Sequence, residues 1–227
     1  MNNIKWNAFY QDAYPDYMVT EELKKSIIWR INRWIGIRCA YVFYRLGFSA
    51  NQISIIRLVM ASIGFFLLSY AVSTDIWEPI IGLVLIIWQV NLDFADGVIA
   101  RVQNKSSDFG EQMDGLANAA SRAAVVILFG YFTQNAFLFW LSVFSGYVLS
   151  AFWDSTKDHV FKQRRLENFR KLFRLSSSVF FTVILLPLIV VLLGIFDIWL
   201  EEISYIITVF YIFLSILWLS ICCFKGE

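Results

Sequence analysis

Histidine, cysteine and proline are scarce in this chain of 227 residues, and each shortage argues against a particular structural or functional feature. The single histidine, His159, argues against a multi-histidine zinc site or a histidine-centred catalytic relay. The three cysteines, Cys39, Cys222 and Cys223, are too few for a disulfide framework. Three prolines leave little room for linkers. A net charge of +1 gives no polyelectrolyte character, so the composition does not indicate a nucleic-acid partner.

Long apolar runs dominate the sequence instead. It is 59% hydrophobic and 18% aromatic, with a mean hydropathy of +0.62. Six runs approach the ~20 residues needed to cross a bilayer. They cover residues 53–72, 76–92, 115–132, 136–153, 177–195 and 203–223. We therefore predict an all-α integral membrane protein, in which residues 51–227 form a domain of six transmembrane helices and residues 1–50 a cytosolic segment.

The distribution of lysine and arginine predicts the orientation of these helices. The connections at residues 73–75, 133–135 and 196–202 contain no lysine or arginine, whereas the N-terminal segment, residues 101–105 and residues 157–174 hold nearly all of the positive charge. Because cytosolic loops carry the excess of basic residues, we expect both termini and the basic segments on the cytosolic face.

Residues 20–38 show a different pattern. Apolar residues recur at helical spacing, and lysines and arginines occupy the opposite face. This pattern is typical of an amphipathic helix that lies in the membrane interface. The alternative is an ordinary amphipathic helix packed against the bundle.

The most informative segment, DFADGVIAR and the residues that follow it, places acids beside predicted membrane spans. Asp93 and Asp96 are three residues apart, so a helix puts them on one face, and Asp114 begins the next span after a polar turn. A hairpin of the two helices would bring Asp114 back toward the first two acids. An acid near the centre of a membrane helix costs about 2.5–3.5 kcal/mol, so such a cluster indicates a compensating cation or polar cavity.

These residue types indicate phosphoryl chemistry on an amphiphile. Three carboxylates form a hard, all-oxygen site suited to Mg²⁺, Mn²⁺ or Ca²⁺. Gly97 and Ala100 add small surfaces that allow a ligand to approach the backbone, and Arg101 supplies a planar cation for phosphate. An ion path in a transporter or channel would explain the acids, but not the regular spacing of the glycines and Arg101 around them.

This segment resembles the motif Asp-x2-Asp-Gly-x2-Ala-Arg-x8-Gly-x3-Asp-x3-Asp of the CDP-alcohol phosphotransferases. The matching residues are Asp93, Asp96, Gly97, Ala100, Arg101, Gly110 and Asp114. Upstream, SANQISIIR is similar to a second element of that family, with Asn51, Ser54 and Arg57 retained and Ala50 in place of a proline.

The resemblance implies transfer of a phosphatidyl-type group from a CDP-linked lipid to a small alcohol, with release of CMP, in phospholipid biosynthesis. It assigns two divalent ions, Mg²⁺ or Mn²⁺, to Asp93, Asp96 and Asp114. It assigns the CDP pocket to Gly97, Ala100, Arg101, Gly110, Asn51 and Arg57. It also implies a homodimer, and the small size of the chain favours a prokaryotic cell membrane and CDP-diacylglycerol as donor. A CDP-alcohol attacked by diacylglycerol stays open as the opposite scheme, and no residue identifies the acceptor.

The chain departs from the motif at its last position, where Asn118 replaces the aspartate that the family uses as the proposed general base. An amide cannot take a proton from a hydroxyl, although its oxygen can ligate a metal. Three explanations stay open. The chain is an engineered variant, or a natural enzyme with another base such as Asp108 or Glu111, or a natural CDP-lipid-binding homologue that has lost transfer. Arg122, one turn after Asn118, is expected to pair with Asp114 or to bind a phosphate.

The basic segment at residues 157–174 is the remaining feature. Such a segment commonly serves topology and contact with anionic lipids. The sharper hypothesis is that Lys157, Arg164 or Arg165 binds a phosphate on the acceptor.

Overall fold

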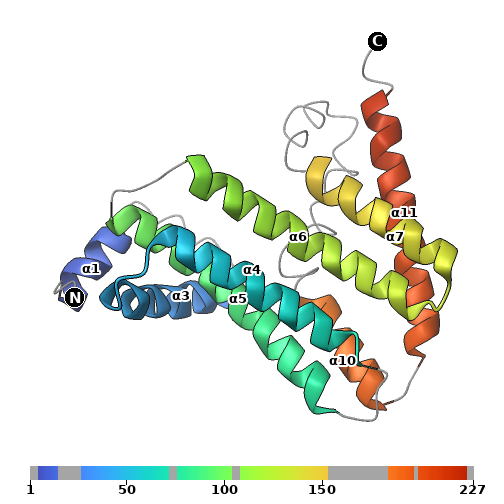
Figure 1. The fold of residues 1–227 in the computed structure, drawn as a ribbon, viewed down its shortest axis with the longest axis horizontal. Helices are drawn as coiled ribbons and strands as arrows, with labels where there is room; N and C mark the ends of the chain where they lie inside the picture. The colour runs from blue at the N-terminus through green and yellow to red at the C-terminus, as the bar shows by residue number, and fades with distance from the viewer. Residues whose placement is uncertain are drawn as a thin grey trace. The chain divides into compact units, whose positions relative to one another are not determined.

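The computed structural model describes residues 5–14, 27–71, 76–103, 108–152, 184–196 and 199–223, and all of its regular structure in these ranges is helical (Figure 1). The chain divides into two compact units, Met1–Ala61 with Ile87–Ala117, and Ser62–Ile86 with Asn118–Glu227. The helices are α1 (Trp6–Ala13), α3 (Ile27–Arg45), α4 (Ala50–Leu68), α5 (Trp77–Val102), α6 (Asp108–Phe132), α7 (Ala136–Tyr147), the π-helix η1 (Val148–Phe152), α10 (Leu186–Phe196) and α11 (Leu200–Cys223).

Four of the predicted spans are confirmed among the described residues. Helices α4, α5, α6 and α11 each contain an apolar stretch long enough to cross a membrane. Ala136–Ser150 is apolar but shorter. Helix α10 begins at Leu186, and residues 177–183 of the fifth predicted span lie outside the described residues. Helix α5 is longer than the apolar run at residues 76–92, because it continues through the acidic segment and ends at Val102.

Helix α3 extends further than the amphipathic pattern predicts. It runs to Arg45, seven residues beyond the expected end at residue 38. Nothing in the intervening sequence breaks a helix, and the stop comes from Gly47, whose φ of +86° favours glycine. The amide of Gly47 donates to the carbonyl of Tyr44 at 3.0 Å, and the amide of Phe48 donates to that of Phe43 at 3.0 Å. This is a Schellman cap, completed by the edge-on contact of the Phe43 and Phe48 rings.

Helix α4 begins directly after this cap. The hydroxyl of Ser49 accepts from the amide of Gln52, and the Gln52 side chain accepts from the amide of Ser49 at 2.9 Å. This reciprocal pair is a capping box, which satisfies two amides at the start of the helix. The side chain of Gln103, just beyond α5, donates to the carbonyl of Phe48 at 3.2 Å. The end of α5 is therefore tied to the turn from which α4 starts.

The core of the first unit holds α5 against α1 and α3. Its buried members include Phe9 and Ile37 together with an apolar stripe along α5: Leu92, Ala95, Val98 and Ile99. Gly36 of α3 lies against α5 so closely that a Cβ atom there would be 2.5 Å from the Cβ of Phe94. Because this stripe is buried, the adjacent positions of α5, which carry the acids, are held in a fixed direction.

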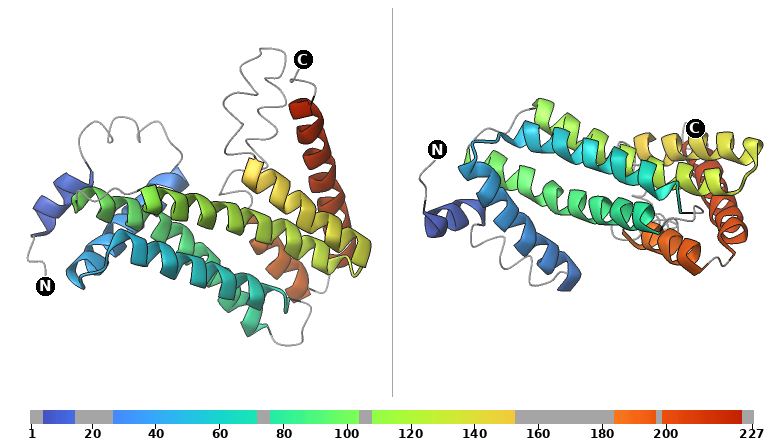
Figure 2. Two further views of the ribbon diagram at one scale, coloured as in Figure 1. Left: turned by 45° about the horizontal axis from the view of Figure 1, so that its top comes forward. Right: turned by 60° about the horizontal axis from the view of Figure 1, so that its bottom comes forward.

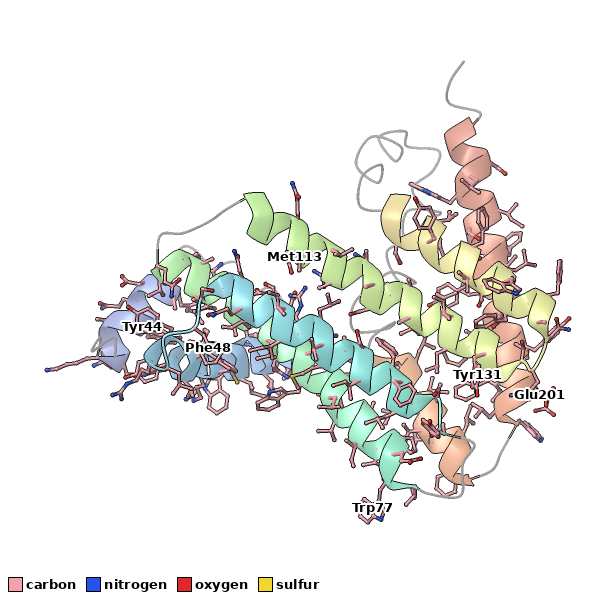
Figure 3. The ribbon with its side chains drawn as sticks, in the orientation of Figure 1. Tyr44, Phe48, Trp77, Met113, Tyr131 and Glu201 are labelled. Carbon is pink, nitrogen blue, oxygen red and sulfur yellow. The ribbon has the colours of Figure 1, made fainter. Side chains whose placement is uncertain are left out.

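In the second unit, α7 and α11 pack side by side (Figure 2). The buried hydroxyls of Ser145 and Ser215 share a hydrogen bond of 2.7 Å between the two helices. Exposed aromatic and acidic residues mark helix ends in this unit: Trp77 begins α5, Tyr131 lies in the last turn of α6 and Glu201 in the first turn of α11 (Figure 3). Aromatic residues at helix ends are typical of the boundary between membrane and water.

Candidate functional site

The candidate site is organised around Arg57 on α4. Its side chain is buried, with 0% of the residue exposed to solvent. The Nη1 atom contacts a carboxylate oxygen of Asp93, lies 3.2 Å from Oδ2 of Asp96 and lies 2.8 Å from Oδ1 of Asp114. The Nη2 atom donates to the backbone carbonyl of Asp114 at 3.1 Å. One guanidinium therefore joins acids from α5 and α6.

The hairpin inferred from the sequence does bring the three acids together. Asp93 and Asp96 come from neighbouring positions of α5, and Asp114 comes from the second turn of α6. Their side chains differ in access to solvent: Asp96 is 9% exposed, Asp93 29% and Asp114 47%. The cluster is thus closed behind Asp96 and open beside Asp114.

Ser54 supports the most buried acid. It lies one turn before Arg57 on α4, is itself buried, and donates from its hydroxyl to Oδ2 of Asp96 at 2.9 Å. Hydrogen bonds to ionised groups are stronger than neutral ones, so this contact fixes the carboxylate in place. The sequence places Ser54 beside Arg57 on one helical face, but its partner becomes identifiable only when α4 and α5 are seen together.

The small residues of α5 leave backbone accessible beside the acids. A Cβ atom at Gly97 would have one neighbour within 4 Å, Nη1 of Arg101 at 3.6 Å. Ala100 and Arg101 are partly buried on the next turn. Asn51, in the first turn of α4, and Gly110, in the first turn of α6, are also partly buried. A flat or phosphorylated ligand could approach the backbone at Gly97 without displacing a side chain.

Helix α6 carries the position at which the chain departs from the expected motif. Asn118 follows Asp114 by one helical turn and is partly buried. The Nε atom of Arg122 donates to the backbone carbonyl of Asn118 at 3.1 Å, a contact that the sequence did not indicate. Asp108 and Glu111 lie in the first turn of α6, but their side chains are outside the described part of the structure. Lys157, Arg164 and Arg165 lie entirely outside the described residues.

The carboxylates of the cluster are suitable ligands for a divalent ion, but they are not arranged around a position for one. Their oxygens are the hard ligands that Mg²⁺ and Mn²⁺ prefer, and all three reach one common atom. Within the described ranges, no group of three acidic, histidine or cysteine side chains is arranged to hold a metal as it stands. Because the guanidinium stands among the carboxylates, ion binding would require Arg57 to move.

Electrostatics favour an added cation. When all three carboxylates are ionised, they and the one guanidinium carry two net negative charges in a partly buried cluster. Such charge excess is costly in low dielectric, and a divalent ion would cancel it. The arrangement can therefore hold a cation and, through that cation, a phosphorylated ligand.

Comparison with known proteins identifies the class. The model of the CDP-alcohol phosphatidyltransferase family matches residues 48–222, which is most of the chain and includes every residue of the acidic cluster. This chain belongs to that family, whose members are phosphotransferases that transfer a phosphatidyl group from a CDP-alcohol. A search of curated proteins gave no match to the sequence.

Proposed function

We propose that this protein transfers a phosphatidyl group from CDP-diacylglycerol to a small alcohol and releases CMP. The observation that carries the proposal is the convergence of Asp93, Asp96 and Asp114 on one point, within the region that matches the family. In the reaction, the acceptor oxygen forms a bond to the lipid-side phosphorus as the bond from that phosphorus to the CMP oxygen breaks. The hydroxyl proton passes to a base, and CMP leaves as a phosphate monoester.

Asp93, Asp96 and Asp114 would hold two divalent ions, Mg²⁺ or Mn²⁺. When bound, the ions neutralise diphosphate charge and stabilise the leaving phosphate. The chain itself contributes by holding the carboxylates in position. Ser54 fixes the carboxylate of Asp96, and the buried stripe of α5 fixes the direction of both acids on that helix.

The CDP moiety would lie along the partly buried backbone at Gly97, with Ala100, Gly110 and Asn51 shaping the pocket. Support comes from the few neighbours of Gly97, where a Cβ atom would meet only Nη1 of Arg101 within 4 Å. Arg101 and Arg57 would each offer a guanidinium to the diphosphate, which suits the bidentate geometry of arginine. Lys157, Arg164 and Arg165 would bind a phosphate on the acceptor.

Asn118 supports a second candidate function, in which the protein binds a CDP-lipid but transfers little or no phosphatidyl group. The amide stands one turn after Asp114, where the family has a carboxylate. If the protein is active, another group must accept the hydroxyl proton. Glu111 and Asp108, at the start of the same helix, are the carboxylates we propose for that role.

We place the reaction at the cytosolic face of a prokaryotic cell membrane, with the enzyme as a homodimer. Helix α3 would lie in the interface, because Ile27, Ile31 and Trp34 form an exposed apolar face while Arg30 and Arg38 are also exposed. Arg38 stacks on the ring of Trp34, with 3.4 Å from its Cζ to the ring centroid, as expected of a cation at the edge of a bilayer.

The test is CMP release from CDP-diacylglycerol with Mn²⁺ and a pool of acceptor alcohols, comparing the chain with Asn118→Asp. Activity of the unchanged chain supports transfer with another base, and Glu111→Gln and Asp108→Asn then identify it. Activity of Asn118→Asp alone supports the binding homologue. CMP release by neither protein, in preparations that still bind CDP, would refute the assignment of the donor.

A further inference from the structure

Arg57 occupies the point that the three carboxylates share. Its Nη1 atom contacts Asp93, Asp96 and Asp114, and its Nη2 atom holds the backbone of Asp114. A group bound to all three acids would have to stand near Nη1. The guanidinium and a divalent ion therefore need the same carboxylate oxygens.

The hydrogen bonds of the Arg57 guanidinium are unevenly shared among its nitrogen atoms. Each Nη atom of arginine carries two hydrogens, so Nη1 cannot give a separate hydrogen bond to each of three carboxylates. The Nε atom of Arg57, in contrast, is buried and has no hydrogen-bond partner among the described residues. One nitrogen of Arg57 has more acceptors than hydrogens and another has no acceptor, so the guanidinium itself is available for other partners.

Access to the cluster is one-sided. Arg57 and Asp96 are almost closed to solvent, with 1% and 9% of their side chains exposed, whereas Asp93 and Asp114 reach 29% and 47%. An ion would approach beside Asp114, where the Arg57 contacts are the most exposed. As the ion approaches, the more deeply buried contacts, including that of Ser54 with Asp96, would be the last to break.

We propose that Arg57 is a resident counter-ion of the acidic cluster, which holds the three carboxylates together in the metal-free protein and competes with divalent ions for them. The inference rests on the proposed metal site. Arg57 gives up its contacts with the carboxylates when a divalent ion binds, and its guanidinium then becomes available to an anionic group such as a phosphate. The same contacts of Arg57 therefore stabilise the metal-free cluster and lower its affinity for a divalent ion.

The experiment is a calorimetric titration of the full-length protein in detergent with Mn²⁺ alone, together with its melting temperature in EDTA. Arg57→Gln removes the competing cation, so we expect Mn²⁺ to bind at least about tenfold more tightly than in the unchanged protein. In EDTA the variant should melt at a temperature about 5 °C or more lower, because three uncompensated acids remain. The matched control is Arg45→Gln, which changes an exposed arginine of α3 and should alter neither quantity.

Unchanged or weaker Mn²⁺ binding by Arg57→Gln would overturn the proposal, as would an unchanged melting temperature in EDTA. If Arg57→Gln does not fold, Arg57→Met decides, because it also removes the competing cation while filling a similar volume and should also tighten Mn²⁺ binding; equal or weaker binding would then refute the competition. If the unchanged protein binds no Mn²⁺, the proposed metal site fails and this inference fails with it. If the unchanged protein and the Arg57 variants bind Mn²⁺ equally well, the counter-ion role of Arg57 is refuted and the proposed metal site is not.

Discussion

Replacing Gly36 by alanine should loosen the packing that directs the acids of α5. A Cβ atom at this position would lie 2.5 Å from the Cβ of Phe94 and 3.0 Å from the backbone oxygen of Asn91. Carbon atoms pack best at about 3.5–4.0 Å, and neither neighbour can rotate away, because one is fixed to the backbone and the other is part of it. Helices α3 and α5 would therefore have to separate.

The size of the effect follows from two opposing terms. Overpacking a core costs about 1–3 kcal/mol, and two immovable neighbours favour the upper half of that range. Alanine regains about 1 kcal/mol over glycine in a helix. The net loss of unfolding free energy should be about 1–2 kcal/mol, which corresponds to a fall in melting temperature of about 2–8 °C for a chain of this size.

Tryptophan fluorescence can follow the unfolding, since the chain has 9 tryptophans. Gly115→Ala is the matched control, because a Cβ atom at Gly115 would meet nothing within 4 Å. That variant should gain about 0.5–1 kcal/mol from helix propensity alone. Gly36→Ala should also weaken Mn²⁺-dependent CDP binding, since Phe94 lies between Asp93 and Asp96. If Gly36→Ala were as stable as Gly115→Ala, the close approach of α3 and α5 would be wrong.

Two further substitutions test the site, and one measurement of pH dependence tests the burial of Cys39 in α3. Ser54→Ala should lower unfolding free energy in EDTA by about 1.5–3 kcal/mol, because it removes a hydrogen bond to the ionised Asp96, and Ser54→Thr should restore most of it; equal melting of both variants would contradict this. Alanine at both Arg164 and Arg165 should raise the KM for a phosphorylated acceptor without weakening CDP-lipid binding, and an unchanged KM would remove their assigned role. Burial raises the pKa of the Cys39 thiol, so less thiolate is present at any given pH. The rate of Cys39 alkylation, followed by peptide mass spectrometry, should therefore reach half its maximum at a pH above the ordinary cysteine pKa of about 8.5. A midpoint at or below that pH would contradict the burial.

The sequence predicts the helices that carry a strong periodic or apolar signal. Helices α4, α5, α6 and α11 follow from their long apolar runs, and the continuation of α5 is compatible with DFADGVIAR because this segment contains no proline. The junction of α3 and α4 was readable in principle from Gly47 and from the Ser49-x-x-Gln52 capping pattern. The amphipathic pattern of residues 20–38 does not indicate this junction, because hydrophobic periodicity does not mark where a helix stops.

The convergence of the three acids could be predicted from their spacing, but the ion pairs of Arg57 could not. The contact of Arg57 with CDP that the family-like element indicates stays a prediction, and the structure adds ion pairs with the acids themselves. Residues 57, 93 and 114 are distant in sequence, and no local pattern records which cation faces which carboxylate. Such pairings are fixed by helix packing, here by the apolar stripe of α5 and the tie between Gln103 and Phe48.

Charge balance gives a final prediction about the number of ions. Four carboxylates would balance two divalent ions, but this chain has three, because Asn118 is neutral. A second ion would leave excess positive charge near the buried Arg57 unless a diphosphate supplied negative charge. We therefore expect calorimetry to detect one tightly bound Mn²⁺ without nucleotide and a second only when CDP is present. Asn118→Asp should allow the second ion to bind without CDP. Two ions bound with equal affinity to the unchanged chain, in the absence of nucleotide, would show that the carboxylates do not control the stoichiometry.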